Sequence, residues 1–172
     1  MPRQMYFAVL IMHIALGLCA ADGIQRNAPA KSTLAVLEFQ SSSLSEEEML
    51  LFSDQVASYI AENGLFTVVG RAEREAIIRE LEFSLSEMSE SRQSVELGRL
   101  LSAQYLLTGN IGNIGSNRYW INMKLIETKS GEVSRSISKE YRSLTQLLDD
   151  CKKITLALID PEGHGSGDYK LV

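Results

Sequence analysis

The chain has 172 residues, of which 45% are hydrophobic and 23% are charged, and its formal net charge is −5 at pH 7. This balance is typical of a folded globular domain and excludes disordered and collagen-like chains. Lysines and arginines are scattered among acids, which argues against nucleic acid as a partner and against electrostatic docking on an anionic membrane. Without a targeting segment, the length fits one domain with a single core.

The N-terminus has the order of a secretory signal peptide. Arg3 precedes an apolar stretch over residues 5–18, and the small residues Ala20 and Ala21 follow. A membrane span needs roughly 20 apolar residues, so this stretch is short for one. We predict a signal peptide over residues 1–21, cleaved near Ala20 or Ala21, and a mature chain without a transmembrane span. An uncleaved membrane anchor is the alternative.

Cys19 occupies the position that a lipoprotein cysteine would have. Leu16 lies three residues before it, as expected, but Leu18 is bulky where that cleavage signal favours a small residue. Two modes of processing are therefore open, namely lipidation of Cys19 and cleavage that discards it. In both cases Cys151 is the only internal thiol of the mature chain, so no intrachain disulfide is expected.

The mature chain is expected to begin with two βα units. Residues 22–32 form a polar tether, and residues 33–39 form a buried strand. Ser45 and Glu48 make a capping box, so a helix should begin there and end at Gly64. A strand over residues 65–69 and a helix over 71–83 follow. Residues 84–93 are polar without apolar periodicity and predict a loop or a frayed turn.

The second half begins with a short helix and then changes to strand periodicity. We predict a helix over residues 95–102, strands over 105–114, 119–128 and 133–142, and a closing helix capped by Ser143 and Gln146. The apolar stripe of that helix comprises Leu144, Leu147, Leu148, Cys151, Ile154, Thr155 and Leu158. We expect Leu147, Leu148, Ile154 and Leu158 to face the sheet.

The predicted fold class is α/β (α+β), with a mixed sheet of about five strands flanked by helices in the order β-α-β-α-α-β-β-β-α. It forms one domain over residues 33–160, and residues 161–172 form a flexible Gly-rich tail.

Few residues suggest catalysis. Gly109, Gly112 and Gly115 do not form a phosphate loop, because they lead into a strand and not into a helix. His13 lies in the signal segment and His164 in the tail, so no scaffold fixes a histidine for a triad or a metal. Cys151 lies on an apolar stripe and is expected to be an inert buried thiol. We therefore expect no enzyme, no cofactor and no metal site.

Trp120 interrupts the pattern of its strand. The alternation places Ile121, Met123 and Leu125 on the core face and leaves Trp120 with Asn122 and Lys124 on the other face. A tryptophan on a polar sheet face is typical of a protein-binding hot spot. Partial burial under a neighbouring loop is the alternative. Trp120, Asn122 and Lys124 are the candidate binding surface.

Several stretches resemble the curli-secretion (CsgG/HfaB) superfamily, which includes lipoprotein activators of penicillin-binding proteins and N-terminal domains of TolB-like proteins. In that family's order, they are LAVLEF at 34–39, FTVVGR at 66–71, AIIRE at 76–80, ELGRLLSAQYLLTGNI at 96–111 and INMKLIETKSGEV at 121–133. Pore-forming members carry amphipathic hairpins inside the domain, whereas residues 84–93 and 115–117 are too short and polar for them. Gly70 replaces an acidic residue that often precedes the family's arginine.

The resemblance implies a non-catalytic binding or assembly module of the bacterial envelope without the channel of its pore-forming relatives. It implies a periplasmic location, with lipid anchoring to the outer membrane if Cys19 is lipidated. The expected partners are envelope proteins of secretion, assembly or peptidoglycan synthesis, and a second copy of the chain is a further candidate. The alternative is a small envelope hydrolase or a ligand-binding enzyme subunit with an unrecognised site.

Overall fold

The computed structural model describes residues 31–85, 88–164 and 170–171. Lys31–Val172 form one compact unit. The predicted signal peptide, Cys19, His13 and nearly all of the predicted tether lie outside the described residues. In the described ranges, no helix combines the length and apolar character needed to cross a membrane.

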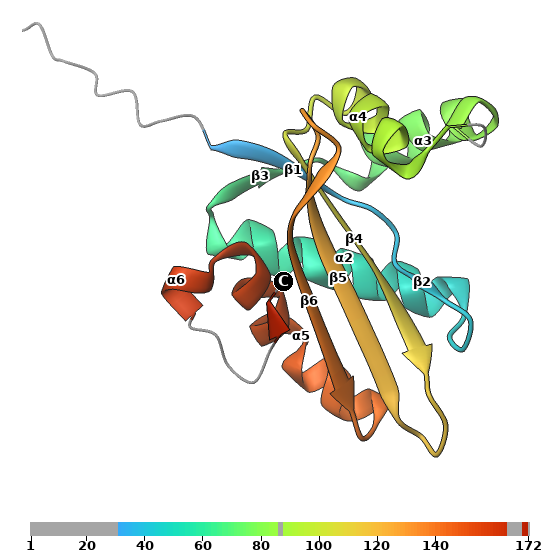
Figure 1. The fold of residues 1–172 in the computed structure, drawn as a ribbon, viewed down its shortest axis with the longest axis vertical. Helices are drawn as coiled ribbons and strands as arrows, with labels where there is room; N and C mark the ends of the chain where they lie inside the picture. The colour runs from blue at the N-terminus through green and yellow to red at the C-terminus, as the bar shows by residue number, and fades with distance from the viewer. Residues whose placement is uncertain (1–30, 86–87, 165–169, 172) are drawn as a thin grey trace, which may run out of the picture. The chain divides into compact units, whose positions relative to one another are not determined.

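A mixed β-sheet forms the centre of the unit (Figure 1). Its main strands are β1 (Ser32–Val36), β3 (Phe66–Val68), β4 (Tyr105–Asn113), β5 (Tyr119–Glu127) and β6 (Glu132–Tyr141). The two-residue strands β2 (Gln40–Ser41) and β7 (Lys170–Leu171) pair with β4 and β6. The order along the sheet is β3-β1-β4-β5-β6-β7, parallel among β3, β1 and β4 and antiparallel from β4 to β7. The predicted mixed sheet flanked by helices is confirmed.

Two helices, α2 (Glu46–Asn63) and α5 (Leu144–Ile159), cover one face of the sheet. The predicted capping box of α2 is present, since the Ser45 hydroxyl accepts from the Glu48 amide and the Glu48 carboxylate accepts from the Ser45 amide. Gly64 ends α2 with a φ of 77°, the left-handed conformation that glycine adopts without strain. The core beneath these helices includes Phe39 and Phe52, whose rings meet edge to face at 5.0 Å.

Part of the other face is covered by α3 (Arg71–Leu85) and α4 (Glu90–Leu100). The prediction of a loop over residues 84–93 is wrong at its end, because α4 starts at Glu90. Ser94, Leu97 and Gly98 are buried at helical spacing, and the Ser94 hydroxyl donates to the Glu90 carbonyl at 3.0 Å. Ser94 is a small polar residue at a buried position of α4. The apolar periodicity therefore begins only after the first turn of the helix, and the sequence pattern does not predict that turn.

The closing helix α5 departs from the prediction at one position. Leu147, Cys151, Ile154 and Leu158 are buried, but Leu148 is 50% exposed. Consecutive residues of a helix point in directions about 100° apart. Because Leu147 points at the sheet, its neighbour Leu148 points toward solvent. The prediction that Leu148 faces the sheet is therefore wrong.

The cap of α5 also differs in part from the predicted capping box. The Ser143 hydroxyl accepts from the Gln146 amide at 3.2 Å, as expected. The Gln146 side chain, however, accepts from the amide of Arg142 instead of Ser143. After α5, the predicted tail contains the short helix α6 (Pro161–His164) and β7. The domain boundaries at residues 160 and 161 stay a prediction.

Candidate functional site

In the part of the chain that the structure describes, one face of the sheet carries a stretch of exposed, polar surface. On the face opposite α2 and α5, the segments of β4, β5 and β6 beyond α3 and α4 carry side chains that are exposed or half-buried. Figure 1 shows α3 and α4 near one end of these strands, beside the β5–β6 turn, and the strands running away from them toward the β4–β5 turn. We call this surface the open sheet face. It comprises Thr108, Asn110, Gly112, Trp120, Asn122, Lys124, Ser136, Ser138 and Glu140.

Trp120 lies half-buried in this face and is held by both neighbouring strands. Its indole Nε1 donates a hydrogen bond to the Ser138 hydroxyl on β6 at 2.7 Å. On β4 it faces Gly112, where an added Cβ would lie 4.0 Å from the indole ring. An aromatic side chain with a fixed orientation loses little entropy when a partner covers it. Trp120 therefore lies on the sheet face opposite Ile121, Met123 and Leu125, as the alternation along β5 predicts.

Asn122 and Lys124 follow Trp120 on the same face, and both are half-buried. The Oδ1 atom of Asn122 is shielded from solvent and accepts no hydrogen bond within the described ranges. A shielded acceptor without a donor costs roughly 1–3 kcal/mol of stability. The structure brings the three predicted surface residues together, but their role in binding stays a prediction.

An ion pair borders the open sheet face. Arg118 Nη2 lies 2.6 Å from the Glu140 carboxylate, and Glu140 is the β6 residue opposite Trp120. Both side chains are more than half exposed, so the pair adds little stability. It presents charge of both signs beside the indole. Sequence reasoning missed Ser138 and Glu140, which only the register between β5 and β6 places beside Trp120, and it did not use the β4–β5 turn to place Gly112 there.

Groups suited to catalysis are not assembled in the described part of the chain. There, no three His, Cys, Asp or Glu residues lie close enough to hold a metal ion. Burial raises the pKa of the Cys151 thiol to about 12, so the reactive thiolate is scarce near neutral pH. Gly109 and Gly112 are inside the continuous strand β4 and do not form a phosphate loop. By its mixed sheet and flanking helices, the described part of the chain is a small α/β domain.

The comparison with protein families names a narrower group. The family model described as "Peptidoglycan-synthase activator LpoB" matches residues 17–140, well over half of the chain. The chain belongs to this family. The description is that of an activator of an enzyme, in agreement with the expected non-catalytic module and with the expected relation to penicillin-binding-protein activators. No curated protein sequence gives a significant match.

Solved structures support the fold. The LpoB C-terminal domain from Escherichia coli is 23% identical, with a TM-score of 0.52, and the match covers 77% of this chain and 93% of that domain. The corresponding domain from Salmonella enterica is also 23% identical, with a TM-score of 0.51 over 69% of this chain and 87% of that domain. A PelC dodecamer from Paraburkholderia phytofirmans is 14% identical, with a TM-score of 0.50 over 76% of this chain and 87% of that chain.

Proposed function

We propose that this protein activates a peptidoglycan synthase of the bacterial envelope by docking on it through the open sheet face. The family supplies the class of partner, since its description names peptidoglycan synthases as what it activates. The open sheet face supplies the surface. The observation that carries the proposal is the tryptophan fixed there by Ser138, out of phase with the core.

The chemistry of the face suits a protein partner better than a small substrate. The face is a sheet surface with an aromatic anchor surrounded by amide, hydroxyl and charged groups. Buried aromatic anchors with a polar surrounding are the usual centre of a protein interface. Lys124 supplies a positive charge for an acidic group of the synthase.

We place the mature chain in the periplasm, supported by the signal-peptide pattern of residues 1–21 and by the envelope process that the family serves. The family match begins at residue 17 and so includes Cys19. Mass spectrometry of the mature N-terminus distinguishes a chain cut near Ala20 from one that is lipidated on Cys19 and anchored to a membrane. The wider kinship with the curli-secretion superfamily is retained as a proposal, supported by the order of the matching stretches.

The proposal is tested by binding of the mature chain to a purified peptidoglycan synthase from the same bacterium. Loss of an aromatic anchor commonly costs about 2 kcal/mol, so Trp120→Ala should weaken binding roughly thirtyfold. Leu51→Ala is the matched control, because Leu51 is 63% exposed on α2, which covers the opposite face of the sheet.

A second variant keeps the proposal testable if Trp120→Ala does not fold. Lys124→Glu reverses a charge of the open sheet face and leaves the indole and Ser138 in place, and we expect it to weaken binding at least fivefold. Circular dichroism confirms that each variant is folded. Folded Trp120→Ala and Lys124→Glu proteins that both bind as tightly as the parent would refute docking through this face.

A further inference from the structure

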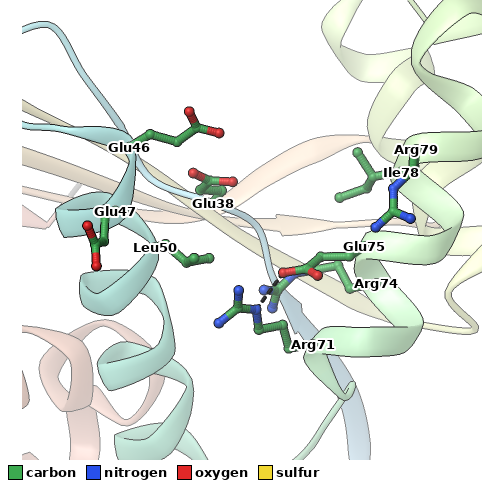
Figure 2. A pocket seen from close by; sticks show the side chains of 9 residues that line it. All are labelled: Glu38, Glu46, Glu47, Leu50, Arg71, Arg74, Glu75, Ile78 and Arg79. Carbon is green, nitrogen blue, oxygen red and sulfur yellow. Dashed lines mark hydrogen bonds and ion pairs between the residues drawn. The ribbon is translucent and has the colours of Figure 1, made fainter.

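A second surface lies between the start of α2 and the helix α3, and it shares no residue with the open sheet face. It is an open hollow of about 520 Å³ (Figure 2). Arginines of α3 form one wall, namely Arg71, Arg74 and Arg79. Glutamates that precede or begin α2 form the opposite wall, namely Glu38, Glu46 and Glu47. The hollow therefore has a basic side and an acidic side.

Arg74 is the unusual residue of this hollow. Its side chain lines the hollow, yet only 3% of the residue is exposed, and within the described ranges it forms no ion pair or side-chain hydrogen bond. Asp54 and Glu75, two carboxylates that act on Arg74 at longer range, are both paired with Arg71, which lies 2.8 Å from Asp54 and 2.5 Å from Glu75. Figure 2 shows Arg71 and Glu75 joined, with the Arg74 side chain beside them. Arg74, a nearly buried residue, therefore has no direct counter-ion among the described residues.

A buried charge without a close partner is costly, because it gives up hydration and gains no ion pair in return. Burial lowers the pKa of Arg74, although Asp54, Glu75 and Glu38 act in the opposite direction at longer range. Arginine stays protonated even so, because its ordinary pKa lies far above neutral pH. An anion beside Arg74 would offset this cost, and a carboxylate matches the planar fork of a guanidinium.

The acidic wall restricts which anion fits. The lining contains four glutamates, counting Glu75, and three arginines, so its formal charge is −1. A polyanion would be repelled by Glu46 and Glu47, which engage no side chain in the part of the chain that the structure describes. A ligand that carries one carboxylate and one cationic group can match both walls.

We propose that this hollow binds a short ampholytic peptide, whose carboxylate pairs with Arg74 and Arg79 and whose neighbouring cationic group lies against Glu46 and Glu47. Arg74 is the buried anchor, and the exposed Arg79 closes over the carboxylate from the wall of α3. The site is independent of synthase docking at the open sheet face and does not rest on it.

The probe is acetyl-Glu-Gly-Lys-amide, whose blocked ends leave one carboxylate and one ammonium. Its binding to the mature chain is followed by NMR chemical-shift titration. We expect shifts at the amides of α3 and the first turn of α2, and at least tenfold weaker binding of the peptides with Gln in place of Glu or of Lys. Equal binding of all three peptides, or no binding of the first, would overturn the proposal.

Substitution of the anchor separates a ligand site from a structural arginine. Arg74→Met removes the charge and keeps an apolar stem, so we expect at least tenfold weaker peptide binding and a melting temperature equal to or above that of the parent. A lower melting temperature would mean that Arg74 stabilises the free fold, and it would contradict the proposal. Arg79→Gln, on the exposed side of α3, should weaken binding without affecting folding.

Two controls complete the experiment. Arg118→Gln removes an exposed arginine of the β4–β5 connection and should leave peptide binding unchanged. Glu46→Gln combined with Glu47→Gln should weaken binding of the Glu-Gly-Lys peptide but not of the peptide in which Gln replaces Lys. If the double variant weakened both peptides equally, the acidic wall would not recognise the cation, and the ampholytic ligand would be the wrong class.

Discussion

Two glycines of β4 show how single residues shape the two faces of the sheet. Gly109 faces the core, where an added Cβ would lie 2.4 Å from Phe39 Cε1 and 2.5 Å from the carbonyl oxygen of Asn122. Gly112 lies on the open sheet face, where the nearest atom to such a Cβ is in the Trp120 ring, at 4.0 Å. The first glycine is required for packing, whereas the second tolerates a methyl group.

We therefore expect Gly109→Ala to lower the free energy of unfolding by about 1–3 kcal/mol, because the methyl group overpacks the Phe39 site. Gly112→Ala should change it by less than about 0.5 kcal/mol, since the new contact is an ordinary one. Urea denaturation of both variants measures the difference. Equal losses in the two proteins would mean that the Phe39 ring does not lie over Gly109.

Asp150 of α5 is a second residue that stabilises the fold, because it links the helix to β6. Its Oδ2 accepts from Lys139 Nζ and from the Tyr141 hydroxyl, each at 2.7 Å. Burial raises the pKa of Asp150. The two hydrogen bonds and the charge of Lys139 together lower this pKa by more than burial raises it, so the net shift is downward. A carboxyl with a lowered pKa in the folded state stabilises the fold above its unfolded pKa, about 4, and loses that effect as the pH falls through its folded value.

Asp150→Asn should therefore lower the free energy of unfolding by about 1 kcal/mol at pH 7, and the difference from the parent should shrink as the pH approaches 3. Asp149→Asn, at the exposed neighbouring position, serves as the control. Chemical denaturation at pH 7, 5 and 3 gives the comparison. A deficit of Asp150→Asn that is constant over this range would contradict the assigned ion pair.

At the scale of elements, the helices and hairpins whose ends are set by local caps and turns are predictable from the sequence. The start and end of α2 follow from Ser45, Glu48 and Gly64, because a capping box and a left-handed stop are local interactions. The β4–β5 hairpin follows from its turn, which fixes Gly112 opposite Trp120. The start of α4 was missed because Ser94, a buried polar residue, hides the apolar period of that helix.

The pairing of β5 with β6 depends on a β-bulge that the sequence pattern does not predict. The register shifts between Leu125 and Ile126, so Ser134 of β6 is an additional residue. This bulge brings Ile137 to the core and Ser138 to the indole of Trp120. A regular hairpin would have exchanged the two faces of β6. The hydrogen-bond partner of the candidate binding residue was therefore not predictable.

Helix α5 offers a direct test of its corrected orientation. Leu147 is 1% exposed and Leu148 is 50% exposed. Truncation of a buried leucine costs about 2–5 kcal/mol, so Leu147→Ala should melt well below the parent protein. Leu148→Ala should lose less than about 1 kcal/mol, because half of its side chain is already in water. Thermal unfolding followed by circular dichroism decides, and an equal loss in both variants would restore the orientation inferred from the sequence.

At the scale of the molecule, the sheet separates stability from binding. Two helices cover one face and provide most of the core, and α3 and α4 cover only part of the other, which leaves the open sheet face uncovered. The side of the sheet that carries Trp120 follows from alternation along one strand. The hollow beside Arg74 combines α2, α3 and the segment after β1, so only the folded chain reveals it.

The most direct test of the account is the rate of glycan-strand polymerisation by a purified peptidoglycan synthase from the same bacterium, measured against the concentration of this protein. The account predicts that the mature chain raises the rate and that folded Trp120→Ala needs roughly thirty times the concentration for half of the maximal effect. A rate that the mature chain leaves unchanged, or a Trp120→Ala protein that activates at the parent's concentration, would contradict it.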